Sequence, residues 1–183
     1  MADFATVEQL ASSLGIDPPT DPLVLGRWQD ALADASGYLR TVIGQPIDAG
    51  TATLDLLTNS AGEADVWLTP VTSITSITDT ERAVVLDVDH WTLKDQRLYL
   101  PRGDTVYEVV LTYGYATIPT EIVRWTKVLA AAQIQVSAAG NLGIDNVSSV
   151  AVDDGKVTYT DTPAVALPES TAQWLKATFG GPQ

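Results

Sequence analysis

The chain of 183 residues contains no cysteine and only one histidine, His90. Without cysteine it can form no disulfide, no thiolate zinc site and no thiol nucleophile. A single imidazole excludes most arrangements in which histidines serve as catalytic base or metal ligand. We therefore expect no enzyme: no catalytic residue, no cofactor and no metal, in a protein made in a reducing cytoplasm.

Positive charge is also scarce, with 10 Lys and Arg against 23 Asp and Glu, a formal net charge of -13 and a pI near 4.1. Affinity for a nucleic-acid backbone comes mainly from Lys and Arg, so a groove that binds DNA is not expected. Solubility alone would explain the acidity. A surface that lies close to DNA without adhering to it would have the same composition, and both interpretations stay open.

No signal peptide is expected, because the first residues, MADFATVEQLA, lack a basic and an apolar region. The most apolar stretch, residues 119–138, contains two cations and two glutamines, which argues against a membrane span. It predicts instead a helix buried in a domain or against another subunit. Its main apolar stripe consists of Ile122, Trp125, Leu129, Ala132 and Val136.

Two further helices are predicted before this one, over residues 6–14 and 21–44. Gly15 ends the first, and Asp21 followed by Pro22 is typical of a helix start. On the second helix one stripe is apolar and the opposite one is charged. The apolar stripe consists of Leu25, Trp28, Leu32, Leu39 and Ile43, and the charged one of Arg27, Asp30 and Asp34. We expect a buried layer that joins Trp28, Leu32 and Leu39 to Ile122, Trp125 and Leu129.

Between these helices, alternating apolar residues and turn residues over 51–113 predict short antiparallel strands. The expected strands are 51–58, 64–68, 72–78, 83–89, 91–93, 97–100 and 105–113. Poor alternation between Ile74 and Ile77 predicts a bulge. After the third helix a hairpin is expected around Asp154 and Gly155, and a final helix opens at Pro168.

Two groups of residues are candidates for small-molecule sites. Asp87 and Asp89 would share a strand face with Trp91, and paired carboxylates can hold calcium or magnesium. The simpler interpretation is that these carboxylates lie on a solvent-exposed strand face and bind no metal. Trp67 and Trp91 could form a sugar-binding platform, because the tryptophans at 28, 125 and 174 occupy helix positions typical of a core.

The order of the parts resembles the head-to-tail connector (adaptor) family of long-tailed phages. The resembling segments are TVEQLASSLG, DPLVLGRWQDALADASGYLRTVIG, PVTSITSIT, GDTVYEVVLTYGY and IPTEIVRWTKVLAAAQ, which together cover roughly residues 4–138. The β region between the second and third helices is longer than in the smallest members of that family. The tail after residue 143 is acidic.

The resemblance implies an α+β fold in which a helical bundle carries an inserted antiparallel β region and a C-terminal hairpin and helix arm. We expect a connector core over residues 1–143 and an arm over 144–183. The implied function is structural: a homo-oligomeric ring, dodecameric in such relatives, that joins the portal protein to a stopper or tail-completion protein in the virion neck. DNA would pass along its axis without specific binding, and no membrane is involved.

The alternative function is a soluble β-rich binding module, either carbohydrate-binding or tail-associated. For the connector, two regions are expected to contact partners. Trp174, Leu175 and Phe179 of the last helix form an apolar patch with no evident place in the preceding core, or they pack on their own domain. Part of the acidity, among Asp30, Asp34, Asp153 and Asp154, would line the DNA passage.

Overall fold

A computed structural model of the chain describes residues 3–141, 149–152, 155–158 and 166–181. Its helices and antiparallel sheets confirm an α+β fold. The chain divides into two compact units, the first formed by residues 1–43 and 118–178 and the second by residues 44–117 and 179–183. This division differs from the expected one, because most of the C-terminal segment belongs with the helices and its last residues belong with the β region.

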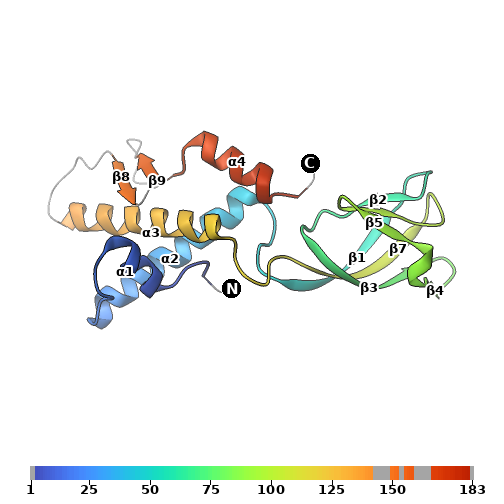
Figure 1. The fold of residues 1–183 in the computed structure, drawn as a ribbon, viewed down its shortest axis with the longest axis horizontal. Coiled ribbons are helices and arrows are strands. Elements are labelled where there is room, and N and C mark those ends of the chain that lie inside the picture. Colours follow the sequence, from blue (N-terminus) through green and yellow to red (C-terminus); the bar gives the residue numbers. More distant parts are fainter. Residues whose placement is uncertain (1–2, 142–148, 153–154, 159–165, 182–183) are drawn as a thin grey trace. The chain divides into compact units, whose positions relative to one another are not determined.

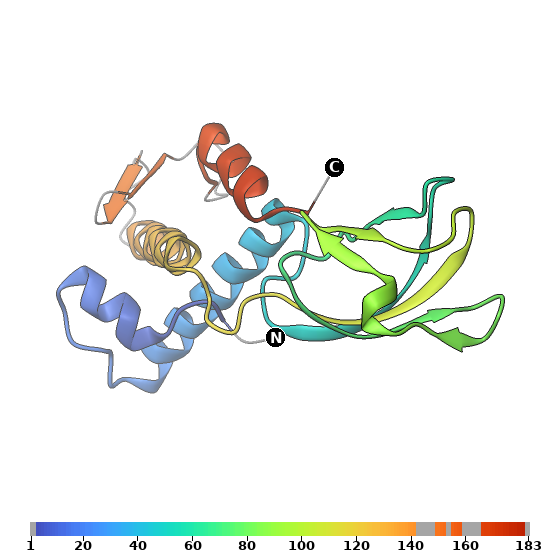
Figure 2. The ribbon, with the colours of Figure 1, turned by 45° about the vertical axis from the view of Figure 1, so that its right-hand side comes forward.

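Among the described residues, the first unit contains three α-helices, a small hairpin and all of a fourth helix except its last residue (Figure 1). The helices are α1 (Val7–Leu14), α2 (Pro22–Ile43), α3 (Thr120–Asn141) and α4 (Glu169–Phe179), and the hairpin strands are β8 (Ser149–Val152) and β9 (Gly155–Thr158). From two directions α3 lies between α1 on one side and α4 on the other (Figure 1, Figure 2). The predicted helices and hairpin are thus confirmed; Asp154 itself lies outside the described residues.

Helix ends form where capping chemistry predicts them. Thr6 and Gln9 make a capping box at the start of α1, and Gly15 ends that helix with a φ of 68°. The Asp21 carboxylate accepts a hydrogen bond of 2.8 Å from the backbone N–H of Leu23 at the start of α2. These local devices set the length of the connection between α1 and α2.

The core of the first unit is the contact between α2 and α3. Trp28, Leu32 and Leu39 are buried on α2, and Arg27, Asp30 and Asp34 are exposed, as expected. On α3, Ile122 and all residues from 128 to 132 are buried, which confirms a helix enclosed within its domain. The prediction of the buried layer is wrong for one residue, because Trp125 is only partly buried. Residues 128–132 point to every side of α3 and all are buried, so other parts of the chain surround the helix there. Around Trp125 this covering is incomplete.

The second unit consists of two antiparallel sheets (Figure 1). The first has the strand order β1 (Gly50–Leu57), β7 (Val106–Tyr113), β3 (Val71–Asp79) and β4 (Val84–Val85). The second has the order β2 (Glu63–Asp65), β6 (Arg97–Tyr99) and β5 (Thr92–Lys94). Side chains from both sheets share one apolar core, which includes Val66, Ile77, Leu98 and Tyr107.

The β region confirms one detail of the sequence interpretation and corrects another. The register of β3 against β7 shifts between Val71 and Ser73 and again between Ile74 and Ser76, so the predicted bulge is present. The predicted strand 83–89 is wrong beyond Val85. A 3₁₀ helix, η1 (Val88–His90), follows it, with Val88 73% exposed, because this segment has no buried face to hold it in a sheet.

Candidate functional site

The three residues predicted to bind a partner do not form one patch. Trp174 is 46% exposed, whereas Leu175 is fully buried. Phe179 is partly buried, and its ring meets that of Tyr115 edge to face with 6.2 Å between centroids. Successive positions on a helix point about 100° apart, so Trp174 and Leu175 face different surroundings. The expectation that this helix has no place in its own domain is therefore wrong for Leu175.

The ends of the C-terminal segment are held by specific hydrogen bonds. The backbone N–H of Leu167, which is itself buried, donates to the hydroxyl of Tyr38 on α2 at 3.3 Å. At the other end the buried Gln45 side-chain amide donates to the carbonyl oxygen of Phe179 and to the Thr69 hydroxyl. Leu167 is thus held within the first unit and Phe179 within the second, and Trp174 is an exposed aromatic residue between them in the sequence.

A groove lies beside Trp174, between the first turns of α3 and α4. It has a volume of about 260 Å³ and is lined by Glu121, Arg124, Trp125, Ser170, Thr171 and Trp174. The Arg124 guanidinium lies 5.7 Å from the centroid of the Trp125 ring and 3.7 Å from a carboxylate oxygen of Glu121. Two indoles flanked by a cation suit apolar side chains that carry a negative charge nearby.

No known protein family and no curated protein matches this chain. The function proposed below is therefore argued from the residues, charges and grooves of the chain itself. The sequence interpretation missed the groove because helix periodicity placed Trp125 in the core. No signal between neighbours in the chain links Trp125 to Trp174; only the folded chain places both beside one groove.

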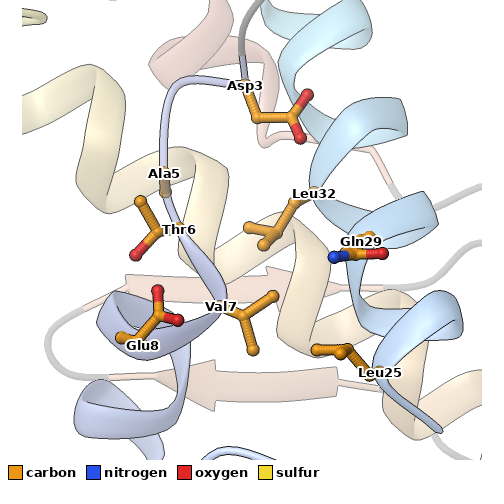
Figure 3. A pocket seen from close by; sticks show the side chains of 8 residues that line it. All are labelled: Asp3, Ala5, Thr6, Val7, Glu8, Leu25, Gln29 and Leu32. Carbon is orange, nitrogen blue, oxygen red and sulfur yellow. The ribbon is translucent and has the colours of Figure 1, made fainter. Parts of the chain in front are cut away.

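A second hollow, of about 410 Å³, lies between the start of α1 and α2 (Figure 3). Val7 and Leu25 point toward each other across it, and Asp3, Glu8 and Gln29 supply its polar wall. The Thr6 hydroxyl and the backbone N–H of Glu8 lower the pKa of the Glu8 carboxyl, so that this group is charged at neutral pH. Its negative wall suits a cationic group better than an anion.

The most constrained charges of the second unit surround Asp79, whose side chain is almost fully buried. Burial raises the pKa of this carboxyl, but hydrogen bonds from the backbone N–H of Arg82 and from Arg102 outweigh that effect and lower it overall. Arg102 also binds Glu81 at 3.1 Å. The arrangement ties the turn after β3 to the segment before β7, which is a structural role.

Neither the predicted cation site nor the predicted sugar-binding platform is formed as expected. Asp87 and Asp89 do not share a strand face, because the chain turns through η1 there. Within the described ranges, no three His, Asp or Glu side chains gather as metal ligands do. Trp91 packs against the core of the second unit, whereas Trp67 is 53% exposed. In the described part of the chain, no helix is long and apolar enough to cross a membrane.

Proposed function

We propose that the chain is a subunit of the head-to-tail connector of a long-tailed phage. In this role it forms a ring below the portal, joins the capsid to a stopper or tail-completion protein and surrounds the passage of the DNA. It works by packing against partners and catalyses no reaction.

The observation that carries the proposal is the order of the elements. Two N-terminal helices precede an antiparallel β region that is inserted before a third helix, and α2 and α3 pack together although the whole β region separates them in the sequence. That arrangement agrees with the resemblance, which rests on the same segments. The net charge of -13 also supports it, since a connector must let DNA slide past its subunits.

The test is co-expression of the chain with the portal protein encoded in the same genome, followed by native mass spectrometry. The expected result is a portal ring that gains multiple copies of a 19.5 kDa subunit. A genome with this gene interrupted should yield DNA-filled heads without tails, and the wild-type chain supplied in trans should restore infectious particles.

A portal that gains no mass, together with virions that lack the chain, would refute the connector. Retention of the purified chain on immobilised polysaccharide, abolished by Trp67→Ala, would favour the alternative of a carbohydrate-binding module instead. Trp67 is the informative position, because its ring is exposed and Trp91 is packed against the core.

A further inference from the structure

The helical unit has two ends of opposite charge. Helices α2 and α3 lie side by side, joined among other contacts by a hydrogen bond of 2.8 Å from Gln133 to Asp34, and the start of α3 lies near the end of α2 (Figure 1). At that end lie Arg40, Arg124, Lys127 and Lys176, against Glu121, Glu169 and Asp3, whose neighbour Phe4 packs under the Arg40 guanidinium. Toward the opposite end of α2 lie Glu8, Asp17, Asp21 and Asp30, against Arg27. Among the described residues, one end is therefore net basic and the other net acidic.

Each end also exposes apolar surface. At the acidic end, Ile16, Leu23 and Val24 are 54%, 67% and 37% exposed, and they flank Asp17 and Asp21 in the sequence. We call these three residues the apolar knob. The basic end carries the groove with Trp125 and Trp174. Exposed apolar groups concentrated within charged surroundings are typical of protein interfaces, and tryptophan is the residue that most often dominates their binding energy.

The knob and the groove cannot meet within one copy. Leu23 and Tyr38 are separated by about 22 Å along α2, at 1.5 Å per residue, and Tyr38 is the residue that bonds the start of the α4 segment. In both ribbon views α1 and α4 lie on different sides of α3 (Figure 1, Figure 2). A contact between knob and groove must therefore join two copies of the chain.

We infer that the groove between α3 and α4 binds the apolar knob of a second copy of this chain, with Asp17 and Asp21 of the knob facing Arg124 at the groove. Such a contact uses two different surfaces of each copy, so every copy keeps one knob and one groove available for the next. The repeated contact builds a ring if its rotation closes. The closure and the copy number rest on the proposed function; the contact itself rests on charge and shape.

Because the chain has no cysteine, engineered cysteines report the contact without background. The double variant Leu23→Cys with Thr171→Cys places one thiol on the knob and one in the groove. Under mild oxidation at high protein concentration it should form a ladder of dimers, trimers and larger products. Either single variant can form no species larger than a dimer. The matched control replaces Thr171→Cys by Gln173→Cys, which lies on the same helix but is exposed and does not line the groove.

Charge exchange tests the proposed orientation. Arg124→Glu and Asp17→Arg should each weaken cross-linking of the double-cysteine variant, and the two together should restore it. Trp174→Ala should lower the association constant measured by sedimentation about 30-fold, as the loss of a dominant interface aromatic does. Circular dichroism of each variant shows whether it is folded.

Cross-linking of the groove pair no greater than that of the control pair would overturn the inference. If such a chain still joins phage heads, the connector stands and another surface joins its subunits. If the ladder forms but the chain never enters heads, the contact between copies stands and the connector function fails. The two conclusions are thus separable.

Discussion

At the scale of single residues, burial differs from what helix periodicity alone predicts. Trp125 and Leu129 lie one turn apart on the same stripe of α3, yet Leu129 is 3% exposed and Trp125 is partly exposed at a groove. A side chain on an apolar stripe is covered only where another element covers it. The size of a tryptophan is therefore no measure of its contribution to the core.

We accordingly expect Leu129→Ala to lower the free energy of unfolding by about 2 to 5 kcal/mol, as large-to-small core changes do. Trp125→Ala should cost less, because part of its ring already contacts solvent. Urea unfolding followed by circular dichroism measures both. A larger loss for Trp125→Ala would show that the groove side of α3 is more enclosed than the structure describes.

The charges around Asp79 predict a dependence of stability on pH. The pKa of Asp79 in the folded protein lies below its ordinary value near 3.8, so the charged form stabilises the folded state above about pH 4. This contribution disappears as the pH falls through the lowered pKa. Asp79→Asn should therefore lower the melting temperature at pH 7, and the difference from the wild type should shrink below pH 4.

The control for this prediction is Glu81→Gln, which removes the more exposed partner of the same Arg102. Its effect at pH 7 should be smaller, since exposed ion pairs contribute little. An equal loss in both variants would mean that the guanidinium, and not the buried carboxylate, holds the turn in place.

At the scale of the elements, α4 is the one whose role the structure changes most. A short amphipathic helix after an irregular linker is typical of a docking arm, and isolated helices of this length are marginal in water. Here the helix has Leu175 fully buried, Leu167 buried just before it and a hydrogen bond from Gln45 at its last residue. Leu167 and Leu175 belong to the first unit, and Phe179 belongs with Gln45 to the second, so the described part of the segment is not a free arm.

Truncation after Thr160 should consequently lower the melting temperature, the opposite of what a free arm predicts. Two buried leucines are lost, and each contributes about 1.5 to 3 kcal/mol. Trp174→Ala in the full chain is the control, because it alters the same helix at a half-exposed position and should change the melting temperature little. An unchanged melting curve after truncation would restore the interpretation of α4 as a free arm.

At the scale of the whole molecule, the dominant property is the excess of negative charge. A ring multiplies the charge of each subunit around its axis, and a surface that repels DNA lets it slide. Asp30 is exposed, and Asp34 is exposed while it accepts a hydrogen bond from Gln133. Asp153 and Asp154 lie outside the described residues.

Replacement of Asp30, Asp34, Asp153 and Asp154 by Lys should slow DNA ejection, more at low salt than at high salt, because salt screens the new attraction. The matched variant with Asn at the same positions removes the negative charge without adding attraction and should eject DNA nearly normally. Ejection kinetics followed by a DNA-binding dye at two salt concentrations measure the effect. Normal ejection by the Lys variant at low salt would refute a channel lined by these residues.

Local chemistry determined much of this protein from the sequence alone. Capping residues such as Thr6, Gly15 and Asp21 set helix ends, and period-two patterns set most strands, because these signals act between neighbours in the chain. The bulge between Ile74 and Ile77 was also readable, since alternation fails within the strand itself. The fold class and the order of the elements follow from such signals.

What only the tertiary structure decided depends on which elements meet. Helix periodicity identifies the apolar face of α4 but cannot name its partner, so Leu175 became an expected docking residue although it is buried. The same gap hid the groove, whose two tryptophans are 49 positions apart, from Trp125 to Trp174. Burial is a property of a residue together with whatever covers it, and what covers it here comes from distant parts of the chain.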